Sequence, residues 1–451
     1  MGRVGMLARQ TPAGRERYVD FLRALAICLV VLGHWLVTVI AYGASGKVTG
    51  FNALVDLVWA RPLTWLFQVI PVFFLVGGFA NAASLTSGRA RGTTATQWLL
   101  DRSGRLVRPT TVLVVILAVG AAVGSLAGAD RVEIRTVVQF ATIPLWFLIA
   151  YFAVVALTPV MYRLHQRFGF AVVAVLVVLV ALGDVARLVH HGALAGGGYI
   201  FGWLALHQVG FAWYDSHAGE TRKVRRLPMN RTAAVLILVV GAAAVSLLTF
   251  AGPYQVSMIN IPGEHLHNTS PPTLALLALA AAQLGLILLL REPAERMVHR
   301  PGPWRAVVAM NAVVLTVFLW HMSAVVLLVG VLNLAHWLPP TSVGTGTWWA
   351  WRVPWLLVLA VILAGLTAIF GRVEARATHP PSGQRAGWPA PTLRTVLTVA
   401  GYAGVVAGLA INSAASRSTP EPLGLPLAAL VAYLAGAAIL RLLRSGKPRR
   451  P

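Results

Sequence analysis

Long apolar runs separated by short polar segments fill most of the chain. A helix needs about 20 apolar residues to cross a bilayer, and twelve runs approach that length. They lie at 19–41, 63–85, 110–128, 142–161, 169–189, 198–214, 232–252, 273–290, 307–333, 351–371, 395–414 and 424–443. The pattern predicts an all-α fold, a polytopic transmembrane helical bundle of about 12 spans. The sixth run is the weakest, because it is short and contains His207 and Gln208.

The basic residues are distributed unevenly between the predicted loops. With the N-terminus inside, every inside segment is basic, and the long outside loop at 253–272 has no Lys or Arg. The inside clusters fall within 89–108, 163–167, 222–231, 291–305, 372–394 and 441–450. Cytoplasmic loops carry an excess of Lys and Arg, so we expect both termini in the cytoplasm. A miscount of one helix would have reversed the bias partway along the chain.

Composition supports a membrane protein and excludes two other classes. Only 11% of the residues are charged and 57% are hydrophobic, whereas a soluble chain is about a quarter charged. The net charge of +23 is dispersed among short loops, while a nucleic-acid binder would gather it on one polar domain. Membrane lipids, and no nucleic acid, are therefore the expected partners. The single Cys28 excludes a disulfide or a thiolate metal cluster within one chain.

The first apolar run contains three ionisable residues: Asp20, Arg23 and His34. Such groups are costly inside a membrane and are functional candidates. Arg23 and His34 are eleven residues apart, which is about 16 Å along a helix and close to three full turns. A cation and a deeper imidazole thus share one helix face. Arginine suits phosphates, and a neutral imidazole can act as a base or nucleophile; a helix-packing role is the alternative for His34.

Five segments, in chain order, resemble the motifs of the membrane acyltransferase family 3. They are Arg23-x10-His34, Pro71-Val-Phe-Phe-Leu-Val-Gly-Gly-Phe79, Arg105-Leu-Val-Arg108-Pro109, Leu145-Trp146-Phe-Leu-Ile-Ala-Tyr151 and Phe318-Leu-Trp-His321. Gly77 stands where the family usually has serine, so any role of that hydroxyl is absent or supplied elsewhere. Arg102 with Arg105 is an overlapping match to Arg-x-x-Arg; we prefer Arg105 with Arg108, because proline follows directly.

The resemblance implies a ten-helix core, acyl-CoA as the cytoplasmic donor substrate, and transfer to a hydroxyl of a glycan or lipid. It assigns catalysis to His34, with Arg23 supporting donor binding or positioning and His321 completing the site. Arg105, Arg108 and Arg102 would hold the phosphates of the donor, and Trp146 would contact the acceptor. His207, in the short sixth run, is a further candidate for lining the acceptor channel. For the arginines, positive-inside topology alone is the alternative explanation; for His321, it is packing.

The expected organisation is an acyltransferase-like membrane core at 1–371, a cytoplasmic linker at 372–394, and an additional helical pair with a basic tail at 395–451. Ala, Gly, Val and Arg are abundant, as in GC-rich bacterial genomes, so the expected location is a bacterial cytoplasmic membrane. We expect acetyl as the acyl group and no metal: His190, His191, Glu264, His265 and His267 are read as solvated loop residues, and Asp184 as paired with Arg187. A transporter or flippase of a lipid-linked sugar is the alternative function.

Overall fold

Helices make up almost all of the described chain. The structure is a computed structural model that describes residues 3–12, 14–42, 46, 48–189, 198–220, 225–262, 266–338, 342–376, 390–416, 421 and 425–444. The centre of the predicted linker (377–389), the tail beyond Arg444, and the loop residues His190, His191, Glu264 and His265 lie outside this description.

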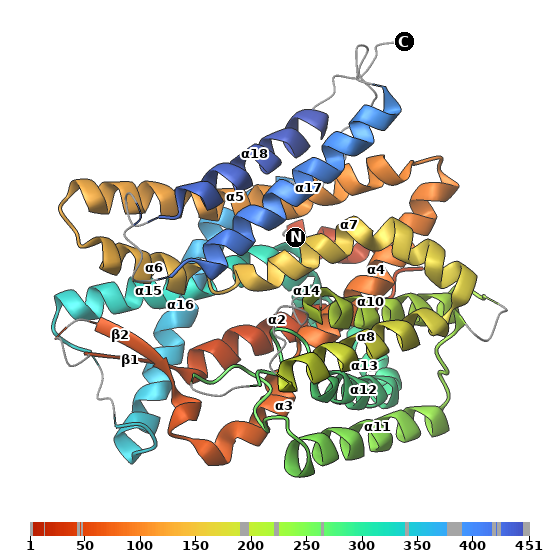
Figure 1. Cartoon of the computed structure of the whole chain (residues 1–451), viewed down its shortest axis with the longest axis horizontal. Coiled ribbons are helices and arrows are strands. Elements are labelled where there is room, and N and C mark those ends of the chain that lie inside the picture. The colour runs from red at the N-terminus through yellow and green to blue at the C-terminus, as the bar shows by residue number, and fades with distance from the viewer. Residues whose placement is uncertain are drawn as a thin grey trace. The chain divides into compact units, whose positions relative to one another are not determined.

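Each of the twelve predicted segments is occupied by a helix (Figure 1). These are α2 (Arg17–Val37), α4 (Ile70–Ala90), α5 (Ala95–Leu126), α7 (Leu145–Phe168), α8 (Phe170–Leu188), α10 (Gly198–His217), α11 (Arg231–Ser246), α12 (Leu274–Leu289), α15 (Val314–Leu334), α16 (Gly346–Arg376), α17 (Pro391–Ala414) and α18 (Leu427–Arg444). In the described part, 10 helical stretches are long and apolar enough to cross a membrane by themselves. The helix α12 qualifies only together with α13 (Arg291–Val298), across a 57° bend. The prediction of a multi-pass helical membrane protein is confirmed.

The remaining elements are short and connect the long helices. They are α1 (Arg3–Arg9), β1 (Thr38–Tyr42), β2 (Val48–Asn52), η1 (Ala53–Val55), η2 (Val58–Leu63), α3 (Thr64–Phe67), α6 (Arg131–Thr142), the π-helical turn η4 (Leu247–Ala251) and α14 (Pro301–Ala312).

Two predicted spans end or break differently from expectation. The first span was predicted to reach residue 41, but Thr38–Tyr42 pairs antiparallel with Val48–Asn52, since a β-branched run favours a strand. The ninth was predicted to be continuous over 307–333, but it divides into α14 and α15 at Val313, whose φ of −133° and ψ of 15° are not helical.

The third span differs most, and the difference affects the candidate site. It was predicted to begin at residue 110, after a basic loop, but α5 begins at Ala95 and is 32 residues long. The Thr94 hydroxyl accepts the Gln97 N–H at 3.2 Å and so caps the helix. Arg102, Arg105 and Arg108 therefore lie on a helix and not in a loop, and the loop prediction is wrong.

The chain folds into two compact units, each assembled from segments that are distant in sequence. Unit 1 comprises Met1–Ser84, Thr158–Asn311 and Pro339–Arg352, and unit 2 comprises Leu85–Leu157, Ala312–Leu338 and Val353–Pro451.

Unit 1 is built around α2 and a close crossing of α4 with α10. The Tyr18 hydroxyl of α2 donates to the Ile287 carbonyl at 2.7 Å, within a core that includes Leu75, Phe79 and Trp213. At the α4–α10 crossing, a Cβ on Gly78 would lie 2.1 Å from the His207 carbonyl oxygen, and one on Gly210 would lie 2.2 Å from the Leu75 carbonyl oxygen. Backbones this close require glycine on both helices.

Glycines also allow close packing of the two helices in the hairpin α11–α12 of unit 1 (Figure 1). A Cβ on Gly241 would meet the Ala282 nitrogen at 2.4 Å, and a Cβ on Gly285 would meet the Leu238 nitrogen at 2.4 Å. Beside it, the predicted Asp184–Arg187 pair is confirmed at 3.7 Å. Burial raises the pKa of the Tyr254 phenol, which therefore stays protonated and donates to Asp184 at 2.9 Å.

Unit 2 contains α5, α6, α15 and the last two helices. In Figure 1, α17 and α18 run side by side, and both pack on α5. Their pairing again depends on small residues, because a Cβ on Gly408 would lie 2.5 Å from the Tyr433 nitrogen. Arg135 of α6 is buried and fastens the end of α17, donating to the Asn412 carbonyl at 2.8 Å and to the Ala415 carbonyl at 3.0 Å.

We expect Gly78→Ala to destabilise the protein by about 1–3 kcal/mol, because the added methyl group would overlap the α10 backbone. The measurement is thermal unfolding of the detergent-purified protein. Gly120→Ala is the matched control, since nothing lies within 4 Å of its Cβ position, and alanine favours a helix there. Equal melting temperatures for the two variants would contradict the proposed close crossing.

Candidate functional site

The eight predicted site residues divide between the two units. Arg23, His34 and His207 belong to unit 1. Arg102, Arg105, Arg108, Trp146 and His321 belong to unit 2.

Arg23 lies near the start of α2 and is held by an acidic partner. Its Nη1 is 3.2 Å from Oδ1 of Asp20, whose other oxygen accepts from Arg15 Nε at 2.5 Å. Asp20 is buried, and Asn311 donates to its backbone carbonyl at 2.8 Å. The Arg23 guanidinium is therefore positioned by a fixed carboxylate.

His34 lies further along α2 in a defined tautomer. Its Nδ1 is 2.8 Å from the Val30 carbonyl oxygen. A carbonyl oxygen only accepts hydrogen bonds, so Nδ1 carries the proton and Nε2 of the neutral ring carries the basic lone pair. The Thr38 hydroxyl donates to the His34 carbonyl at 2.7 Å where the helix gives way to β1. The predicted catalytic residue thus has the protonation pattern that a base or nucleophile needs.

His207 lies in the core of unit 1, 1% exposed, between α4 and α10. Its Nε2 is 3.0 Å from Nδ2 of Asn81, and its ring meets Phe211 edge-on at 4.7 Å. The neighbouring Gln208 donates to the Met161 carbonyl at 3.0 Å. The bond to Asn81 joins α10 to α4, and that of Gln208 joins α10 to α7. The assignment of His207 to the acceptor site stays a prediction.

Two of the predicted motif segments meet in unit 2. Phe147, next to the half-buried Trp146, contacts Phe318 edge-on at 5.3 Å. Phe318 accepts through its carbonyl from Nδ1 of His321 at 2.6 Å. His321 is fully buried, and by the same argument as for His34 its Nε2 is the basic nitrogen. The structure therefore joins the start of α7 to the histidine of α15.

Glu374 of α16 caps the helix that carries His321. Its carboxylate accepts from the Leu315 N–H at 3.1 Å, the Thr316 N–H at 2.8 Å and the Thr316 hydroxyl at 2.7 Å. The N-cap residue of α15 is Val313, whose side chain has no acceptor. A carboxylate at a helix N-terminus satisfies unpaired N–H groups and interacts well with the dipole.

The arginines of α5 follow one another at three-residue spacing. Arg105 and Arg108 are exposed, whereas Arg102 is half-buried and lies over the Trp98 ring at 5.4 Å. Gly104 and Pro109 on the same helix are buried. This part of α5 presents two guanidinium groups outward, as contact with a phosphate requires.

Sequence reasoning missed a second group of buried ionisable residues, in unit 1. His165 Nε2 lies 3.1 Å from Asp215 Oδ2, and the Tyr162 hydroxyl donates to Asp215 Oδ1 at 3.3 Å. All three side chains are buried. Both His165 and Asp215 lie near the ends of apolar runs, where they resemble ordinary interfacial residues; only their pairing identifies them.

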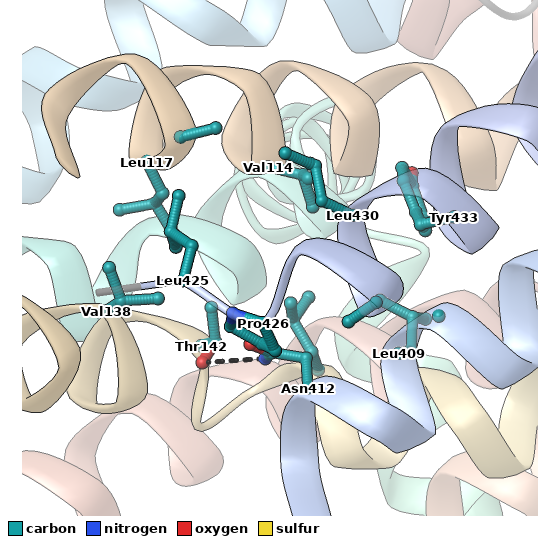
Figure 2. Close-up of a pocket in the computed structure, with 14 residues that line it drawn as sticks. Val114, Leu117, Val138, Thr142, Leu409, Asn412, Leu425, Pro426, Leu430 and Tyr433 are labelled. Atoms are coloured by element: carbon teal, nitrogen blue, oxygen red, sulfur yellow. Dashed lines mark hydrogen bonds between the residues drawn. The ribbon is translucent and has the colours of Figure 1, made fainter. Parts of the chain in front are cut away.

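Figure 2 shows a pocket within unit 2 between α5, α6, α17 and α18. Its lining is apolar, with Leu117, Val138 and Leu430 among the residues, apart from Tyr433 and a hydrogen bond of 3.2 Å from Asn412 to Thr142. These groups supply no base or nucleophile. Within the described ranges, no three His, Cys, Asp or Glu side chains gather as a metal ion would require.

A family model described as an acyltransferase domain matches residues 16–371. The match includes all eight predicted site residues and ends before α17 begins. Searches of curated proteins and of solved structures gave no match.

We expect Glu374→Ala to lower the stability by about 1–2 kcal/mol, because two N–H groups at the start of α15 would lose their acceptor. Glu374→Gln keeps one acceptor oxygen and should recover part of the loss. Thermal unfolding measures both, with the exposed Glu292→Ala as control. A melting temperature of Glu374→Ala equal to that of the control would show that the cap is unimportant.

Proposed function

Because the chain belongs to acyltransferase family 3, as the match over residues 16–371 shows, we propose that it acylates hydroxyl groups with acyl-CoA as the donor. The expected acyl group is acetyl, and the expected acceptor is a cell-envelope glycan, a glycolipid or a secreted compound. The proposed location is the cytoplasmic membrane of a bacterium. The family match favours this membrane acyltransferase over the alternative, a transporter or flippase of a lipid-linked sugar.

The observation that carries the proposal is the tautomer of His34. The hydrogen bond from Nδ1 to the Val30 carbonyl leaves the lone pair on Nε2, and it fixes the direction of the ring. A neutral imidazole held in this way is suited to proton transfer or to nucleophilic attack.

Two routes use this lone pair. In the first, Nε2 removes the proton of the acceptor hydroxyl, the oxygen attacks the thioester carbonyl, and the proton passes to the departing CoA thiolate. In the second, Nε2 attacks the thioester and CoA leaves as the thiolate; the acyl group then passes from the imidazole to the hydroxyl, whose proton ends on the thiolate. Both form one ester and break one thioester. They differ in whether acylated His34 accumulates.

The remaining predicted residues take supporting roles in the proposal. Arg105 and Arg108, with Arg102, bind the donor phosphates, since guanidinium groups contact phosphates through paired hydrogen bonds. Arg23, held by Asp20, positions the donor. His321 would supply a second imidazole, and Trp146 and His207 would contact the acceptor.

We expect His34→Ala to reduce thioester turnover by at least about a hundredfold, the usual contribution of a general base or nucleophile. Release of the CoA thiol is measured with purified protein in nanodiscs, with water as the acceptor where none is supplied. The control is His299→Ala, since His299 is exposed and lies outside every motif.

Normal turnover by folded His34→Ala would rule out His34 as the catalytic residue. Mass spectrometry of the wild type after mixing with acetyl-CoA separates the two routes, because only the second leaves an acetyl group on His34.

We expect the double variant Arg105→Ala/Arg108→Ala to weaken CoA binding by about one hundredfold, as two charge-assisted hydrogen bonds are lost. Calorimetric titration of CoA into nanodiscs tests this, with the exposed Arg305→Ala as control. Unchanged CoA affinity would show that these arginines serve only to orient the protein in the membrane.

A further inference from the structure

The helices α17 and α18 lie outside the family match, which ends at residue 371. We propose that these two helices complete the phosphate-binding site begun by α5, with Arg444 of α18 contacting the phosphates of the nucleotide half of acyl-CoA. This inference rests on the proposed function, since it takes acyl-CoA as the donor. It assigns a role in donor binding to a part of the chain that the family match does not cover.

The first argument is the position of Arg444 on α5. A Cβ built on Gly104 would lie 1.0 Å from Arg444 Nη1 and 2.2 Å from its Cζ. The guanidinium therefore occupies the space that any other residue at position 104 would fill. Because Gly104 has no side chain, it leaves a gap in the surface of α5 that the Arg444 guanidinium fills. Arg105 follows Gly104 directly, so Arg444 lies near the arginines of α5. Membrane topology explains why arginines lie on this side of the membrane. It does not explain why a glycine of α5 leaves space for one of them.

The second argument is the balance of charge. Arg105, Arg394 and Arg444 all act electrostatically on Asp101. Arg444 itself is acted on by Arg108 and Arg441 as well as by Asp101. Three guanidinium groups thus lie near Asp101, and two more lie near Arg444. Neighbouring like charges repel one another, and an anion that carries several charges would relieve the repulsion. The diphosphate and 3′-phosphate of CoA form such an anion.

The third argument is that the surrounding contacts fix this geometry. The Arg394 Nη2 donates to the Gln97 side-chain oxygen at 2.6 Å, and Gln97 Nε2 donates to Asp101 at 2.9 Å. The Tyr402 hydroxyl donates to the Leu99 carbonyl at 2.8 Å, and the Tyr433 hydroxyl lies 3.0 Å from that of Thr111. The helix α17 is therefore bonded to α5 before the arginines, and α18 is bonded to α5 after them. These bonds hold the arginines in place, as a preorganised binding site requires.

An anionic lipid headgroup offers the same phosphate chemistry as the donor, so the experiment must separate the two. We would measure the affinity for CoA and for adenosine 3′,5′-bisphosphate, a probe without the pantetheine arm. The protein is placed in nanodiscs of zwitterionic lipid alone and in nanodiscs that also contain anionic lipid.

The variants are Arg444→Ala and Gly104→Ala. The second displaces the end of a flexible side chain without removing a charge. We expect each to weaken both probes about tenfold in zwitterionic lipid, the loss of one charge-assisted hydrogen bond. The KM for acetyl-CoA should rise by a similar factor while kcat stays unchanged. Arg372→Ala, an exposed arginine of the same unit, is the control and should bind as the wild type does.

Three results would overturn the inference. Unchanged affinities in both variants would remove Arg444 from the site while leaving the proposed function intact. An effect seen only with anionic lipid would assign the cluster to lipid headgroups. A loss of kcat and stability together, with unchanged affinity for the bisphosphate, would make the helix pair a structural support. Failure of the proposed function is recognised separately, as an absence of His34-dependent thioester turnover by the wild type.

Discussion

The bilayer provides no hydrophobic force that drives one apolar helix against another, and the packing of this protein is governed by that constraint. The helices approach one another where side chains are absent. Gly78 and Gly210 bring α4 against α10, and Gly241 and Gly285 join α11 to α12. Once the backbones are close, polar side chains bond between helices, as Asn81 and His207 do beside the first crossing. Glycine contacts thus determine which polar groups meet.

The two candidate histidines make the same local hydrogen bond, which determines that Nδ1 carries a proton. In both His34 and His321, Nδ1 is bonded to a carbonyl of the preceding helical turn. The helix backbone thereby holds a proton on Nδ1. In contrast, His165 is bonded to Asp215 through Nε2. A carboxylate accepts hydrogen bonds as a carbonyl does, so His165 carries a proton on Nε2, whereas His34 and His321 carry one on Nδ1.

The apolar pattern predicted the helices well, because hydropathy reports directly on contact with lipid. The ordered motifs predicted the family, which the match over residues 16–371 confirms. The start of α5 was missed, because polar residues such as Arg102 and Arg105 resemble a loop where a helix leaves the apolar region. The cap from Glu374 and the pairing of His165 with Asp215 join residues distant in sequence. The periodicity of apolar residues does not report contacts between distant segments. It does not report the roles of the site residues either, which activity and binding measurements test.

The gap at Gly104, which the Arg444 guanidinium fills, has an evolutionary consequence. A glycine in the middle of a helix lowers its intrinsic stability by about 1 kcal/mol, and here it makes room for Arg444 of α18. A chain of the same fold without α18 would gain nothing from glycine at this position and could carry alanine or a larger residue there. Glycine at position 104 and arginine at position 444 are therefore expected to be exchanged together.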